Sequence, residues 1–130
     1  MKRILFVCVQ NSGRSQMAEA LLNHMANCKA IGYSAGTSPA EQVNPVVTQV
    51  MDEIGISMKD HRPKPLTPDM LQDMDLIITM GCSDEGVCPA SFVQTDDWNL
   101  EDPKDKPVEE VRKIRDEIKR RVAILVRYLK

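Results

Sequence analysis

The chain has 130 residues and a formal net charge of −2, with 17 Lys and Arg against 19 Asp and Glu. This length supports a core without disulfides, so we predict one domain over residues 1–130. The near balance of charge excludes a basic footprint for nucleic acid or an anionic membrane surface, and no apolar run approaches the ~20 residues that cross a bilayer. We therefore expect a cytoplasmic protein that binds neither nucleic acid nor membrane.

The first predicted strand covers residues 4–8 and ends at Cys8, and a polar loop then leads into a helix near Arg14. Loop amides and a helix start carry partial positive charge, so they suit a tetrahedral oxyanion and favour a thiolate on Cys8. The guanidinium fork can bind two oxygens of the anion at once. We predict an oxyanion site formed by Val9, Gln10, Asn11, Ser12, Gly13, Arg14 and Ser15.

The loop contains residue types that suit this role. Asn11 and Gly13 tolerate the left-handed backbone that a loop with inward-facing amides requires. The Ser15 hydroxyl can donate a hydrogen bond to the sulfur. The alternative is a buried strand cysteine beside an arginine that only caps a helix, and the strand and helix flanks make this reading the weaker one.

The first half of the chain alternates between helices and strands. Helical spacing of apolar residues predicts a helix of about 12 to 15 residues after the loop, with Gln16 off its apolar face. A short strand is predicted at residues 30–36. A helix capped by Asn44 and ended by Gly55 follows.

The second half begins with an extended surface connection at residues 57–68, which we place at the rim of the site. A short helix and a buried strand at residues 76–80 follow, then a long loop with a weak strand at residues 92–93. Apolar residues from Val111 to Leu129 recur at helical spacing, and charged residues cover the rest of this helix. We predict an α/β fold: a three-layer sandwich with a mainly parallel, roughly four-stranded sheet.

Cysteines stand at positions 8, 28, 82 and 88. In the cytosol they are more often catalytic, redox-active or metal-binding than joined in structural disulfides. Ligands of parallel sheets bind beyond the carboxyl ends of the strands. Cys8 and Cys82 each follow a predicted strand, so we expect the two thiols at the same edge. Cys28 is predicted to be a small buried thiol.

The motif Cys8-x5-Arg14-Ser15, continued by residues 16–20, resembles the low-molecular-weight tyrosine phosphatase fold and, more narrowly, its thioredoxin-coupled arsenate reductase branch. Residues 79–89 and 97–103 carry further parts of the resemblance, which runs nearly end to end. It implies an enzyme that reduces arsenate to arsenite, with phosphate or sulfate as analogues of the substrate. It also implies thioredoxin as the external reductant and no bound redox cofactor. We expect this enzyme to be a monomer.

The resemblance further assigns roles to single residues. Cys8 attacks arsenic, Cys82 displaces arsenite from Cys8, and Cys88 resolves the disulfide that results. Asp102, before Pro103, stands where the family keeps its general acid.

Other family positions match supports of the loop, namely Asn11, Ser15, Glu19 and Ser34. Some members bind potassium with residues that match Asn11, Glu19 and Ser34. Lys64 stands where those members carry a further acidic ligand, which argues against a bound potassium ion here. We assign no metal ligands.

Two other functions compete with this reading. A phosphatase acting on phosphotyrosine needs only Cys8, Arg14 and Asp102, but residues 104–106 are Lys-Asp-Lys where such phosphatases place aromatic residues. A non-catalytic arsenic sensor would use the thiols for binding alone. Zinc held by Cys82 and Cys88 with Cys28 and His24 is a weaker alternative, because it needs the first helix to pack against the later loop.

Overall fold

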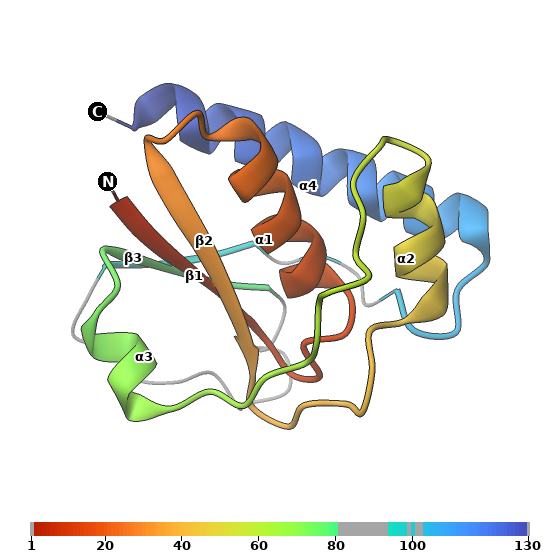
Figure 1. Cartoon of the computed structure of the whole chain (residues 1–130), viewed down its shortest axis with the longest axis horizontal. Coiled ribbons are helices and arrows are strands. Elements are labelled where there is room, and N and C mark those ends of the chain that lie inside the picture. Colours follow the sequence, from red (N-terminus) through yellow and green to blue (C-terminus); the bar gives the residue numbers. More distant parts are fainter. Residues whose placement is uncertain (1, 81–93, 99, 101–102, 130) are drawn as a thin grey trace.

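The computed structural model describes residues 2–80, 94–98, 100 and 103–129 (Figure 1). Within these residues the strands are β1 (Lys2–Cys8), β2 (Ala30–Gly36), β3 (Leu76–Thr79) and β4 (Gln94–Asp97). The helices are α1 (Arg14–Met25), α2 (Pro45–Asp52), α3 (Pro68–Gln72) and α4 (Val108–Tyr128).

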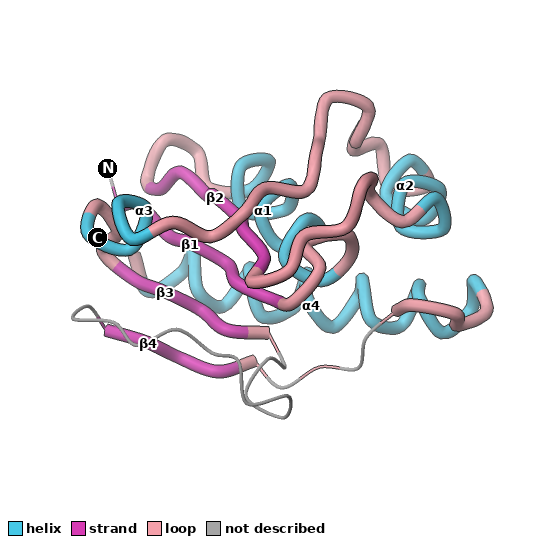
Figure 2. The backbone as a smooth tube through the Cα atoms, turned by 90° about the horizontal axis from the view of Figure 1, so that it is seen from below, coloured by secondary structure: helices cyan, strands magenta, loops and turns pink. Residues whose placement is uncertain are grey.

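The strands form one sheet in the order β2-β1-β3-β4, and every neighbouring pair is parallel (Figure 2). Cys8 pairs with Gly36, and Val7 pairs with Thr79. The carboxyl ends of β1, β2 and β3 therefore meet at one edge of the sheet. The prediction of a mainly parallel, roughly four-stranded sheet is confirmed.

Side chains of β1 alternate between two cores, as the pleat of a strand requires. Ile4 and Phe6 belong to a large core with residues of α1, α2 and α4. Leu5 and Val7 belong to a smaller core, against which Met70 and Leu71 of α3 pack. Helices thus cover both faces of the sheet, with α4 packed against α1 on one of them (Figure 1). The prediction of three layers is confirmed.

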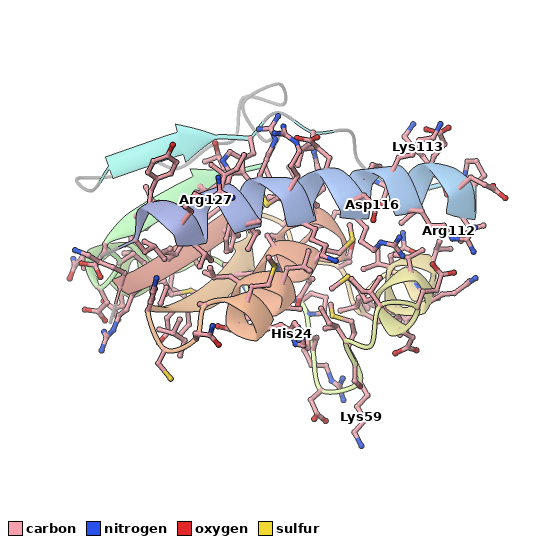
Figure 3. The ribbon with its side chains drawn as sticks, turned by 90° about the horizontal axis from the view of Figure 1, so that it is seen from above. His24, Lys59, Arg112, Lys113, Asp116 and Arg127 are labelled. Carbon is pink, nitrogen blue, oxygen red and sulfur yellow. The ribbon has the colours of Figure 1, made fainter. Side chains whose placement is uncertain are left out.

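Local sequence signals set the helix ends. The Asn44 side chain accepts a hydrogen bond from the backbone N–H of Val46 at 2.9 Å and caps α2. Gly55, three residues past α2, has φ +80° and turns the chain away. In α4 the apolar spacing buries Val111, Ile114, Ile118 and Val122, while charged residues such as Lys113 and Asp116 point outward (Figure 3). Among the described helices, none combines the length and the apolar composition that a bilayer span requires.

Two predictions for single segments need comment. The weak strand predicted at residues 92–93 lies outside the described residues, and β4 begins at Gln94 with the polar sequence Gln-Thr-Asp-Asp. The prediction of a buried Cys28 was wrong, because its thiol is exposed. Helix α1 ends at Met25, and Asn27 (φ 48°) and Cys28 (φ 68°) form a left-handed turn on the surface before β2.

Candidate active site

Cys8 lies at the end of β1, with 3% of its surface exposed. Its sulfur accepts a hydrogen bond from the backbone N–H of Asn11 at 3.2 Å and lies 2.9 Å from the Ser15 hydroxyl oxygen. The Asn11 side-chain amide donates to the same hydroxyl oxygen at 2.7 Å. Because this oxygen already accepts a hydrogen bond, its own hydrogen is available for the sulfur. Both donors stabilise negative charge on Cys8.

The Asn11 side chain joins the loop to α1 and to the extended connection through hydrogen bonds. Asn11 has φ 52°, in the left-handed region, as predicted. Its side-chain oxygen accepts from the Gln16 amide at 3.0 Å and from the backbone N–H of Lys64 at 2.8 Å. The orientation of the Asn11 amide is therefore fixed from both ends, and with it the direction of the Ser15 hydrogen bond to Cys8.

Gln16 was predicted to lie off the buried face of the first helix, and this was wrong, because its side chain is fully buried. Its nitrogen donates to the backbone oxygens of Asn11 at 3.1 Å and Arg62 at 2.9 Å. Its oxygen faces His61 Nδ1 at 2.9 Å. Glu19 Oε2 lies 3.2 Å from the same His61 nitrogen. Since both neighbours of Nδ1 are acceptors, Nδ1 carries the proton.

These contacts show that the extended connection lies against the loop, as expected for a rim. Gly36 also donates to the Lys64 carbonyl at 2.8 Å, and Leu66 donates to the Gly36 carbonyl at 2.9 Å. Sequence reasoning missed Gln16 as part of the site, and it placed His61 at the rim without finding its contacts to Gln16 and Glu19. The partners of Gln16 on this connection lie 45 or 46 residues away in the chain, and a lone polar residue next to a motif gives no signal of its own.

Two glycines are required by close approach. A Cβ on Gly36 would lie 2.6 Å from the backbone oxygen of Val9, so only glycine lets the loop pass over the end of β2. A Cβ on Gly13 would lie 2.5 Å from Pro103. Gly13 does not use the left-handed region that its residue type tolerates, because its φ is −139°. Gly13 is needed because its missing side chain leaves room for the Pro103 ring, where a turn begins.

Arg14 begins α1 and is 5% exposed. Its Nη1 donates to the backbone oxygen of Leu100 at 2.8 Å. This contact joins the loop to the segment that precedes α4. The main-chain oxygen of Leu100, 86 positions away in the sequence, therefore holds the guanidinium of Arg14 in place.

A cavity of about 370 Å³ adjoins the loop. Its described lining is polar or aliphatic and contains no aromatic side chain. Ser12 and Gln10 come from the loop. Lys104 and Lys106 come from the turn that begins at Pro103, next to Gly13. The other lining residues are Ala40, Gln42, Asn44, Pro45, Val46, Pro103 and Asp105.

Three predicted site residues, Cys82, Cys88 and Asp102, lie outside the described residues. Val9, Gln10 and Ser12 form the backbone of the loop between Cys8 and Gly13. Ser34 is buried on β2, and its hydroxyl has no hydrogen-bond partner among the described residues. In the part of the chain that the structure describes, no group of three His, Cys, Asp or Glu residues is placed to hold a metal ion.

The potassium ligands implied by the resemblance are largely engaged by protein donors. Asn11 Oδ1 already accepts two hydrogen bonds. Glu19 Oε2 faces His61, and Glu19 Oε1 lies 3.7 Å from the Lys64 ammonium. Only the Ser34 hydroxyl keeps its oxygen unengaged within the described residues. The residues present do not fit a bound potassium ion.

A buried thiol that accepts a hydrogen bond from a loop N–H, at the end of a strand and before a helix that begins with a buried arginine, is typical of enzymes whose cysteine attacks a tetrahedral oxyanion. The family model described as low molecular weight phosphotyrosine protein phosphatase matches residues 3–130. The chain belongs to this family.

Named relatives include both reductases and phosphatases. An arsenate reductase of Staphylococcus aureus is 36% identical over 121 residues, covering 91% of each chain. The structure of a thioredoxin-dependent arsenate reductase of Corynebacterium glutamicum has a TM-score of 0.85 and 40% identity; it covers 99% of this chain, which spans 62% of that longer one. An arginine phosphatase of Geobacillus stearothermophilus has a TM-score of 0.88 and 28% identity, over 99% of this chain and 93% of its own.

Proposed function

We propose that the chain reduces arsenate to arsenite by a cysteine relay. The contacts around the Cys8 sulfur are the observation that carries the proposal, because the Asn11 N–H and the Ser15 hydroxyl both lie within hydrogen-bond distance of the sulfur where the loop begins. The similarity to arsenate reductases over most of the chain supports arsenate as that anion. Three cysteines of the sequence then supply the chemistry.

In the first step the Cys8 thiolate attacks arsenic, and one arsenate oxygen leaves as hydroxide or water. The loop amides and Arg14 hold the remaining oxygens. Asp102 donates the proton to the leaving oxygen. The product is a covalent adduct in which sulfur is bonded to arsenic(V).

In the second step the Cys82 thiolate attacks the Cys8 sulfur. The sulfur–arsenic bond breaks and its electron pair stays with arsenic, so arsenic(V) becomes arsenic(III) and leaves as arsenite. Two thiols have then been oxidised to one Cys8–Cys82 disulfide. Cys88 attacks this disulfide at Cys82 and releases the Cys8 thiolate. The Cys82–Cys88 disulfide is finally reduced by thioredoxin.

The described lining of the cavity that adjoins the loop bears on the choice between an aromatic ester and a small inorganic anion. A phosphotyrosine ring gains binding energy from stacking on aromatic side chains, and the described lining has none. The lysines at its edge instead favour a free dianion such as arsenate or its analogues phosphate and sulfate. A phosphatase acting on aryl phosphates remains the second candidate, because it uses the same Cys8 and Arg14. We further propose that the protein acts as a monomer in the cytoplasm, without nucleic acid or membrane, and reacts there with reduced thioredoxin.

The test is arsenite production with thioredoxin, thioredoxin reductase and NADPH, run beside hydrolysis of an aryl phosphate. Cys82→Ser should stop arsenite release and leave aryl phosphate hydrolysis nearly intact. Cys88→Ser should allow about one turnover and trap a Cys8–Cys82 disulfide, visible by peptide mass mapping. Cys28→Ser is the matched control and should turn over like the unmodified protein. Steady thioredoxin-dependent turnover in either relay variant would refute the relay.

A further inference from the structure

Lys64 makes two separate contacts to the loop supports. Its backbone N–H donates to Asn11 Oδ1 at 2.8 Å. Its ammonium lies 3.3 Å from the Arg62 carbonyl oxygen and 3.7 Å from Glu19 Oε1. A single residue therefore fixes the Asn11 amide through the main chain and places a positive charge beside Glu19 through the side chain.

The surroundings of this ammonium resemble those of a monovalent metal ion. Carboxylate and carbonyl oxygens are the groups that replace the hydration shell of such an ion in proteins. Glu19 is only 12% exposed, so its charge needs a nearby cation or hydrogen-bond donors. His61 Nδ1–H supplies a donor to one carboxylate oxygen, and Lys64 supplies the cation near the other.

We propose that the Lys64 ammonium is a built-in cation that replaces a bound metal ion behind the Cys8 loop, so that the protein is indifferent to the monovalent cation in solution. The hydrogen bond from the Lys64 backbone N–H to Asn11 joins the extended connection at residues 57–68 to the Cys8 loop as one unit. The charge is covalently part of that unit and cannot dissociate when the salt changes. This inference concerns cation binding and holds whichever oxyanion the enzyme turns over.

A charge reversal at this position provides the sharpest test. In Lys64→Asp a second carboxylate faces Glu19, and like charges at short range disfavour the folded state unless a cation lies between them. We expect the melting temperature of the unmodified protein to be equal in KCl, NaCl and choline chloride at about 150 mM each, a concentration that equalises screening. In choline chloride, the melting temperature of Lys64→Asp should be about 5 °C below that of the unmodified protein. KCl should restore most of this difference.

Lys59→Asp is the matched control, since Lys59 is exposed on the same connection and points into solvent (Figure 3). It makes the same change of charge and should melt alike in all three salts. Lys64→Arg keeps the cation and should also be indifferent to the salt. If Lys64→Asp yields no folded protein, Lys64→Gln replaces it, and its melting temperature should rise in KCl relative to choline chloride.

The proposal is overturned if the unmodified protein is stabilised by KCl over choline chloride as much as the Lys64 variant is. It is also overturned if the folded variant melts alike in both salts. Melting is measured without arsenate or thioredoxin, so a failure of the proposed reaction leaves this test unaffected. As a second readout, kcat/KM for arsenate should follow the same salt pattern, flat for the unmodified protein and dependent on KCl for Lys64→Asp.

Discussion

The loop around Cys8 and the contact between α2 and α4 both gather hydrogen-bonding side chains, but they differ in burial. At the loop, Asn11, Ser15 and Gln16 are fully buried, and each makes hydrogen bonds to protein atoms. Between α2 and α4, Glu53 receives hydrogen bonds from Arg112 and Arg115, and the first of these pairs is partly exposed. Solvent weakens the second network, whereas the first must keep its geometry to avoid unpaired buried groups.

Similar hydrogen-bonding side chains therefore serve different ends in the two regions. The hydrogen bonds from Arg112 hold the pKa of the Glu53 carboxyl below its usual range, and Arg115 adds to this effect. This stabilises the folded chain without shaping a site. The buried network instead orients one hydroxyl and one amide toward a sulfur. Changes at the loop should therefore alter activity more than stability, and changes among the ion pairs of α4 should do the reverse.

The largest effect is expected from Cys8→Ser. The hydroxyl is a far weaker nucleophile than a thiolate, so arsenate reduction and any aryl phosphate hydrolysis should both fall by about 10³-fold or more. The change is nearly isosteric, so the melting temperature should stay close to that of the unmodified protein. Steady-state rates measure the loss of activity, and thermal melts measure the melting temperature. Residual turnover near the original rate would contradict the assignment of the nucleophile.

Arg14→Lys should rank second. A lysine ammonium is a point charge that cannot reproduce the fork toward the anion together with the contact to the Leu100 carbonyl. We expect kcat/KM for arsenate to fall by about 10²-fold, comparable to the loss of one transition-state donor. Arg127→Lys on the exposed end of α4 is the control and should have no effect. Unchanged affinity for phosphate in the Arg14 variant would count against the predicted oxyanion site.

Gly36→Ala should lower both activity and stability, unlike the changes that affect mainly one of them. The added methyl group would meet the Val9 backbone oxygen at 2.6 Å, so the loop must shift. We expect a loss of about 1–3 kcal/mol in the free energy of unfolding, together with a clear fall in kcat. Gly55→Ala has open space around its Cβ but φ +80°, so it should lose stability and keep its activity. Urea unfolding and rate measurements on both variants distinguish the two positions.

The smallest effect is expected from Glu117→Gln on α4. Hydrogen bonds from Arg120, and then from Arg121, lower the pKa of Glu117 from 4.5 to about 2. The contribution of this charge to stability is complete above pH 4.5, decreases as the pH falls toward about 2, and is absent below that value. The pair is partly exposed, so the loss at pH 7 should be about 1 kcal/mol or less.

Melting curves between pH 7 and pH 3 measure this effect. The Glu117→Gln variant should lose less stability than the unmodified protein as the pH falls, and its rate at pH 7 should be unchanged. An equal pH dependence in the two proteins would mean that the pKa of Glu117 is not lowered by folding.

The sequence was sufficient for the features that local chemistry determines. Cys8, the loop and Arg14 are contiguous, so a strand, a polar loop and a helix start could be placed before their contacts were known. The cap at Asn44 and the stop at Gly55 were predictable for the same reason. The apolar spacing of α4 predicted its buried face.

The remaining features depend on contacts between distant segments. Gln16 is buried because the connection near Arg62 covers it, and helical periodicity alone places a polar residue outside. Pro103 explains Gly13, although the two are 90 positions apart. Strand β4 has no apolar alternation that would reveal it. Roles for Cys82, Cys88 and Asp102 stay predictions.

The hydrogen bond from Arg14 to the Leu100 carbonyl has a thermodynamic consequence. If Arg14 binds the oxyanion as we propose, one guanidinium holds both the anion and Leu100, so anion occupancy and the position of Leu100 share one free-energy coupling. By reciprocity, an anion that steadies Arg14 steadies Leu100, and any partner that fixes Leu100 raises the affinity for the anion by the same factor.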